Sequence, residues 1–270
     1  MSRRSGTATL LAALLAVFVG CEAETVPTQQ TSSPTSDLGP QEVHYLVAWD
    51  TAGVSVDQPG RLFGLTNNLG VEFEVTRGWM VTYTVEAIAC SDEARVVQPW
   101  WRRALDGAFI SQAWAGHGAM EIGEARLRAS HIEDLASVGS ADEVGAVRIE
   151  PTRLCEVHLL MGRADHHAKT APGAVDMDRQ TLHIEGRWRA QASDAWTTFV
   201  WRTNVGWGAL QPLPAAHNTA DGGVELTLER RLATLFDDID PSHATELAAA
   251  RQILENTVDH TVVRSRLHLH

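Results

Sequence analysis

The sequence predicts a mainly β fold, an antiparallel β-sandwich with short C-terminal helices. Segments that alternate apolar and polar residues follow one another from residue 42 to residue 229, as strands with one buried face do. These segments do not alternate with clear helical segments, which disfavours a parallel α/β sheet and favours a sandwich or a barrel. The clearest helical spacing comes after residue 231.

The strands are expected in the following order. Residues 42–49 form the first. Residues 71–89 alternate with Val71, Phe73 and Val75 on one face, but Arg77 and Gly78 interrupt the pattern, so this segment is two strands or one bent strand. The alternation resumes with Trp79, Val81, Tyr83 and Val85. Further strands are expected at residues 144–150, 153–162, 180–190, 195–203 and 223–229.

Two short helices are expected near the C-terminus. The first covers residues 231–238. The second begins after Asp240 and Pro241, with Ser242 as its N-cap, because a serine oxygen accepts hydrogen bonds from the first free backbone N–H groups of a helix. Residues 104–110 and 122–137 also have some helical character.

The N-terminus is typical of an exported lipoprotein. Arg3 and Arg4 precede a short apolar run, residues 10–19, that is too short to span a bilayer. The segment that ends in Gly20-Cys21 resembles a bacterial lipobox; the alternative is an ordinary signal peptide with an incidental cysteine. The expected organisation is a signal peptide at 1–20, the lipidated Cys21 and a flexible tether at 21–40, and a single β-rich domain at 41–270. The expected location is the bacterial cell envelope, with the lipid in a membrane.

Cys90 and Cys155 remain after Cys21 is assigned to the lipid. An exported compartment permits disulfides, so a Cys90–Cys155 bridge is expected. The alternative is a pair of thiolate metal ligands, which the absence of a Cys-x-x-Cys spacing disfavours.

Charge and motifs limit the functional classes. The formal net charge is −12, so a nucleic-acid partner is not expected. The sequence has no GxSxG, HExxH, Walker or GxGxxG motif. The enzyme question stays open and leans towards no enzyme, with a hydrolase of unknown motif as a third class. Asp237, Asp238 and Asp240 form an acidic turn; calcium binding is the alternative to a structural role.

The twelve histidines provide a metal signal, because neutral imidazole binds copper, zinc and iron. His117 lies between two glycines in an expected loop, three residues after Trp114. His158 lies on an expected strand, with its side chain on the opposite face from that of Cys155. His166 belongs to a pair of adjacent histidines in the next loop. The alternative in each case is a histidine that binds no ligand.

Several segments resemble the MbnP-like family of copper-associated lipoproteins. Residues 71–89 resemble the family's early strand pair, in which a Phe-x-Val strand leads into an aromatic-rich strand. Residues 224–228 followed by 235–240 (LFDDID) resemble its closing strand, turn and helix, and Asn256 matches an asparagine near the end of that helix. Residues 99–139 depart from the family's pattern.

The resemblance implies an exported β-rich protein that works beside a dihaem redox partner. Some members bind copper through histidines and an oxidised tryptophan, for which Trp114 and His117 are the matching pair here, and His44 takes a histidine position on the first strand. The leading functional hypothesis is a lipid-anchored protein that binds copper through His117, with His44, His158 or His166 as further ligands. The runner-up is an envelope interaction or structural module without a metal.

Overall fold

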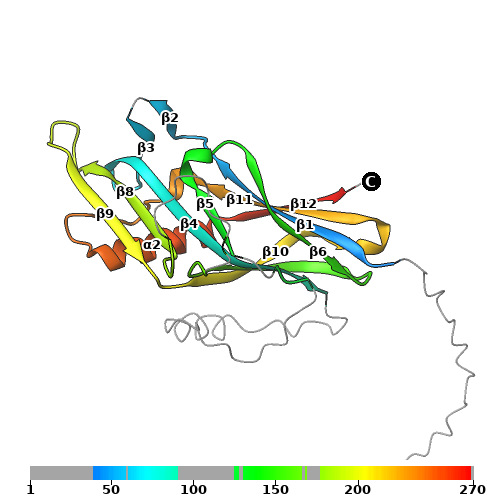
Figure 1. Ribbon diagram of the computed structural model, residues 1–270. Coiled ribbons are helices and arrows are strands. Elements are labelled where there is room, and N and C mark those ends of the chain that lie inside the picture. Colours follow the sequence, from blue (N-terminus) through cyan, green and yellow to red (C-terminus); the bar gives the residue numbers. More distant parts are fainter. Residues whose placement is uncertain are drawn as a thin grey trace, which may run out of the picture. The chain divides into compact units, whose positions relative to one another are not determined.

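Two β-sheets pack against each other in the structure, a computed structural model that describes residues 39–58, 60–90, 125–127, 130–165, 168 and 177–268 (Figure 1). The smaller sheet has the strand order β12-β11-β1-β6. In it, β1 (Gln41–Asp50) runs antiparallel to β6 (Ala141–Ile149) and parallel to β11 (Gly223–Arg231), which pairs with β12 (Val262–His268). The predicted mainly antiparallel sandwich is therefore confirmed, with one parallel pair that the sequence pattern did not indicate.

The larger sheet is built around β4 (Glu72–Ala89). Its strand path is β10-β7-β4-β3-β2, and β5 and β8 also pair with β4, while β9 pairs with β8. The remaining strands of this sheet are β2 Ser55–Gln58, β3 Arg61–Thr66, β5 His131–Asp134, β7 Arg153–Met161, β8 Leu182–Arg189, β9 Thr197–Thr203 and β10 Trp207–Asn218.

Strand β4 is one continuous strand with two main irregularities. Its register shifts between Val75 and Arg77 against β8, and between Thr82 and Thr84 against β7. An extra residue in a strand turns the side chains that follow it to the other face. The bent strand is confirmed, but the resumed alternation is not kept to one face. Val85 lies in the main core, whereas Trp79 and Val81 lie on the outer face, in a second apolar cluster.

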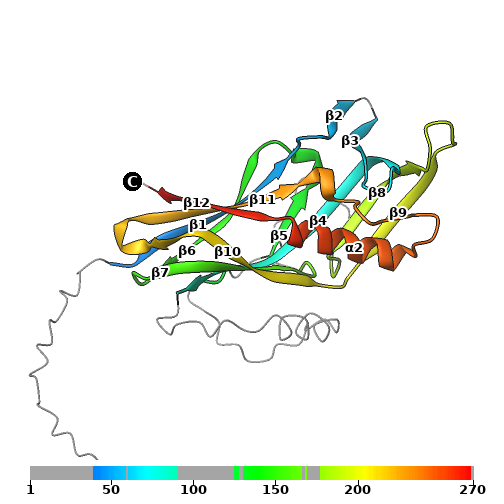
Figure 2. The same cartoon turned by 180° about the vertical axis from the view of Figure 1, so that it is seen from behind.

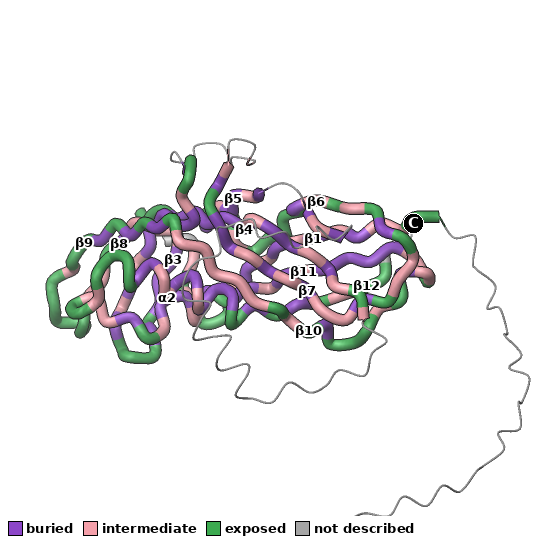
Figure 3. Tube along the Cα trace, turned by 90° about the horizontal axis from the view of Figure 1, so that it is seen from below, coloured by how far each residue is buried: buried purple, intermediate pink, exposed green. Residues whose placement is uncertain are grey.

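The main core lies between the sheets and beneath helix α2 (Glu246–Asp259). Figure 2 shows α2 running beside β9, and Figure 3 shows the buried residues along the middle of the strands. Phe236, which precedes the helix, stacks on Phe73 with ring centroids 4.4 Å apart. The helix buries one apolar face: Ala249, Ala250, Ile253, Leu254 and Val258.

Residues 231–238 do not form the expected α-helix. A 3-10 turn, η3 (Leu232–Thr234), follows β11, and Asp238 then takes a positive φ of 61°. The backbone bonds of this segment run from i to i+3, from Leu235 N to Leu232 O and from Asp237 N to Thr234 O (both 3.1 Å). Side chains distant in sequence hold the turn that follows: Asn67 donates to Phe236 O (2.9 Å), and Asn256 donates to Asp237 O (2.8 Å).

The second expected helix is present but begins later than expected. Thr245 is its N-cap and accepts from the backbone N–H of Ala248 (3.3 Å). Ser242 instead donates its own N–H to the Asp240 carboxylate (2.9 Å) in the turn before the helix.

The helical character expected up to residue 137 is also wrong where the structure describes it, because β5 and the 3-10 turn η1 (Leu135–Ser137) occupy residues 131–137. A further 3-10 turn, η2 (Thr219–Asp221), lies between β10 and β11. Among the described residues, no helix combines the length and apolar character needed to cross a membrane.

The expected disulfide joins Cys90, after the end of β4, to Cys155 on β7. The two Cα atoms are 5.0 Å apart, within the 4.4–6.8 Å that a bridge requires. The backbone N–H of Cys90 also donates to Arg153 O (2.6 Å), so the bridge extends the pairing of two neighbouring strands. Neither sulfur is therefore a thiolate ligand in this structure.

A buried ion pair connects the two sheets. Arg230 on β11 is 0% exposed and Glu133 on β5 is 3% exposed, with Nη2 and Oε1 3.0 Å apart. Arg230 Nη2 also donates to Thr82 Oγ1 (2.5 Å), and that hydroxyl donates to Glu133 Oε1 (2.6 Å). Trp49 Nε1 on β1 donates to Glu133 Oε2 (3.1 Å). Burial lowers the pKa of Arg230, and the nearby Glu133 carboxylate opposes that shift.

Candidate functional site

The structure describes two of the five predicted metal-site residues, His44 and His158. Trp114, His117 and His166 lie outside the described residues, as does the predicted lipidation site Cys21.

His44 lies on the outer face of the smaller sheet. Its neighbours on β1, Val43 and Tyr45, are buried in the main core, so the alternation of the strand turns His44 outward. Two carboxylates flank the ring: Glu42 lies 3.4 Å from Nε2, and Glu143 lies 3.4 Å from Nδ1.

His158 lies on the outer face of the larger sheet, because its neighbours on β7 are in the main core. Its cross-strand partners are Glu86 on β4 and Leu210 on β10. Burial lowers the pKa of His158 below its ordinary value of 6.5, while Glu86 raises it and Arg126 lowers it further. His158 is therefore biased towards the neutral imidazole that metals bind.

These two histidines cannot share a metal ion within one molecule. They point away from each other on opposite outer faces of a sandwich whose sheets pack about 10 Å apart. In the described ranges, no group of three or more His, Cys, Asp or Glu side chains is arranged to hold a metal ion.

A cluster that the sequence did not single out lies elsewhere on the outer face of the larger sheet. Its apolar members are Trp79, Val81, Ile132, Ala164 and Met177. The cluster lies where the partner of β4 changes: Gly162 N, after β7, donates to Val81 O (3.2 Å), and Val81 N donates to Thr181 O (3.0 Å), before β8. The connection between β7 and β8 thus starts and ends over this cluster.

His183 is buried at the edge of this cluster. It is 1% exposed and is the cross-strand partner of Trp79, with the two rings perpendicular and their centroids 5.6 Å apart. Its Nε2 lies 2.8 Å from Glu185 Oε1. Three neighbouring buried atoms have no hydrogen-bond partner in the described part of the chain: His183 Nδ1, Trp79 Nε1 and Thr181 Oγ1.

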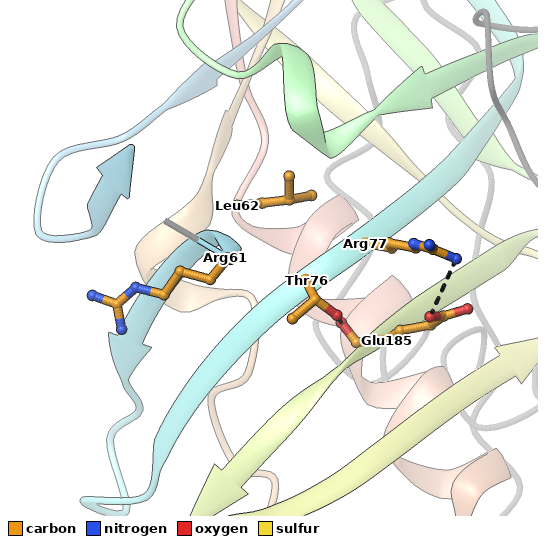
Figure 4. A pocket seen from close by; sticks show the side chains of 6 residues that line it. Arg61, Leu62, Thr76, Arg77 and Glu185 are labelled. Atoms are coloured by element: carbon orange, nitrogen blue, oxygen red, sulfur yellow. Dashed lines mark hydrogen bonds and ion pairs between the residues drawn. The ribbon is translucent and has the colours of Figure 1, made fainter. Parts of the chain in front are cut away.

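Glu185 connects His183 to an open hollow of about 630 Å³ between β3, β4 and β8. Figure 4 shows the guanidinium of Arg77 directed at the Glu185 carboxylate, at 4.0 Å, while Arg61 points away from it and pairs with Glu74. The carboxylate that holds the His183 ring therefore reaches solvent on its other side. The hollow is lined by Gly60, Arg61, Leu62, Thr76, Arg77 and Glu185.

One signal in the sequence could have identified this pair. His183 and Glu185 are two residues apart on a segment expected to be a strand, which places their side chains on one face. This spacing could not predict that His183 is buried, because its burial depends on the register shift in β4 that turns Trp79 outward.

The three carboxylates of the acidic turn, Asp237, Asp238 and Asp240, accept hydrogen bonds from neighbouring residues. Asp237 accepts from the backbone N–H of Asn68 (3.0 Å), and Asp238 accepts from the Asn68 amide (2.8 Å). Asp240 accepts from Ser242 and His243, which lowers the pKa of Asp240 to about 2. These hydrogen bonds favour the structural interpretation over calcium binding.

No family model, curated protein or solved structure matches this chain in the comparisons. The functional argument therefore depends on the residues and their geometry.

Proposed function

We propose that the protein is an exported, lipid-anchored copper-binding protein of the bacterial cell envelope, and that His183 is one of its copper ligands. The proposed partners are the membrane, through the lipid on Cys21, and a dihaem redox protein, which the family resemblance implies. Copper would be held here by soft and borderline donors such as imidazole. The proposed role is copper binding and not catalysis.

The orientation of His183 is the observation that carries this proposal. When Nε2 donates its proton to Glu185, Nδ1 keeps its lone pair. A carboxylate behind the imidazole is the common arrangement of metal-ligating histidines. In His183 that lone pair is buried beside Trp79 with no partner among the described residues, and an unsatisfied buried acceptor costs about 1–3 kcal/mol. A bound copper ion would remove this cost.

The described residues supply one copper ligand and not a complete set. His166 is proposed as a second ligand on sequence grounds, as one of two adjacent histidines in the connection between β7 and β8. His117 and Trp114 stay in the proposal on sequence grounds. His158 is left out, because Glu86, its partner on β4, is about 20 Å along the strand from Trp79. His44 is left out because it lies on the other sheet.

The copper assignment is tested by titrating the full-length protein with copper against a competing chelator. His183→Ala and His117→Ala should each weaken binding by at least tenfold. His243→Ala is the control, because this side chain is 83% exposed and lies in the turn before α2. Circular dichroism checks that each variant is folded.

Each outcome decides between specific alternatives. If the His183 variant binds copper as tightly as the parent, His183 is not a ligand. If the parent itself binds no copper, the copper function is wrong and the interaction module replaces it.

The anchor is tested separately by membrane fractionation of the Cys21→Ser variant. We expect the variant to leave the membrane fraction that holds the parent protein, because it lacks the acylated thiol. A variant that still fractionates with membranes would contradict the lipobox interpretation.

A further inference from the structure

The two faces of strand β5 contact two different features: the buried ion pair on the inner face, and on the outer face the second apolar cluster with His183 at its edge, called the Trp79–His183 cluster below. The strand has four residues and pairs only with β4 among the described strands. Such a short strand has few backbone hydrogen bonds to fix its position, so its side chains must contribute.

On the inner face of β5, Glu133 is held from three directions. It receives Arg230 from β11, Thr82 from β4 and Trp49 from β1, at 3.0, 2.6 and 3.1 Å. Glu133 is buried, and its carboxylate is both paired and hydrogen-bonded. These contacts therefore fix the position of the carboxylate in the interior.

On the outer face of β5, the same strand forms one wall of the second cluster. Ile132 packs in the cluster with Trp79. Asp134 is the cross-strand partner of Trp79, on the side opposite His183. A displacement of β5 therefore removes the support that holds the Trp79 ring against His183.

We infer that Glu133 is a positioning residue for the Trp79–His183 cluster: its contacts in the interior fix β5, and β5 fixes the geometry on the outer face. The effect of Glu133 on copper affinity rests on the proposed function. Its effect on the geometry of Trp79 and His183 does not.

The structural arm uses nuclear magnetic resonance of the metal-free protein. Glu133→Gln keeps the shape of the side chain and removes its charge. We expect the indole N–H signal of Trp79, assigned with Trp79→Phe, and the ring signals of His183 to shift or broaden. The matched control is Asn256→Ala, which removes buried hydrogen bonds to Leu235 O and Asp237 O in the turn before α2, neither of which involves β5, and should leave these signals in place. Unchanged signals in Glu133→Gln, or equal changes in the control, would overturn the inference.

The functional arm measures copper affinity in the same variants. Glu133→Gln should bind copper about tenfold more weakly than the parent, the scale seen when groups behind a metal ligand are altered. The double variant Glu133→Leu/Arg230→Met should restore much of the affinity, because matched apolar residues can seat β5 without charges. If the parent binds copper and Glu133→Gln keeps full affinity, the positioning role is wrong and the copper function stands. If the parent binds none, the copper function fails, and the resonance measurement alone decides the positioning role.

Discussion

Removing the Glu133 carboxylate should be among the most destabilising single changes in this protein. In Glu133→Ala, Arg230 would be left as an unpaired charge that is fully buried, and the Trp49 indole would lose its acceptor. Breaking a buried pair by removing one partner costs about 3–5 kcal/mol, a large share of the roughly 5–15 kcal/mol by which folded domains are stable. We expect a loss of about 4 kcal/mol.

The assay is urea unfolding followed by circular dichroism, and it compares the loss of one charge of the pair with the loss of both. The single Glu133→Ala variant should lower the midpoint by about 1–2 M urea. The double variant Glu133→Leu/Arg230→Met should recover most of this loss, because it leaves no buried charge unpaired; the part not recovered reflects the Trp49 indole and the Thr82 hydroxyl, which still lack their acceptor. A loss below about 1 kcal/mol in the single variant would refute the reasoning, since it would mean that water or another group already compensates Arg230.

Two further predictions follow from hydrogen bonding and pH. Asn67→Ala should lower the free energy of unfolding in urea by about 2–4 kcal/mol, because its buried amide donates to Phe236 O and Ile239 O and its oxygen accepts from two backbone N–H groups. The control Asn68→Ala, at an exposed position, should lower it by less than about 1 kcal/mol. Equal losses in the two variants would contradict this account. Because burial lowers the pKa of folded His158 below 6.5, the unfolded chain binds the proton first as the pH falls. The stability contributed by neutral His158 should therefore be present above about pH 6.5, decrease as the pH falls from there through the folded-state pKa, and level off below it; His158→Gln should lack this decrease in urea midpoints measured from pH 8 to pH 5.

The strand content could be predicted because most strands have one buried face, and alternation records that directly. Residues 153–162 and 180–190 are examples, and both contain strands in the structure. The β2–β3 hairpin and β10 were missed. β2 has four residues, and β10 contains Pro212 and Pro214, which cannot donate to a ladder and so weaken a strand pattern.

The helix at residues 231–238 was mispredicted because the deciding contacts are distant in sequence. Asn67 lies far from the carbonyls of Phe236 and Ile239 that it binds, and no local pattern reveals that pairing. The Trp79–His183 pair was missed for a similar reason: one extra residue in β4 decides which face Trp79 occupies. The disulfide could be expected because the count of cysteines and the expected compartment left one pairing.

The parallel pairing of β1 with β11 has a consequence for the order in which the protein can assemble. A chain is made from its N-terminus, and β1 is complete at Asp50, whereas β11 begins at Gly223. Until Gly223–Arg231 has been synthesised, one edge of β1 has no native partner, and free strand edges readily pair with other chains. The smaller sheet therefore closes only when nearly the whole chain exists, so a truncated chain should be prone to aggregation.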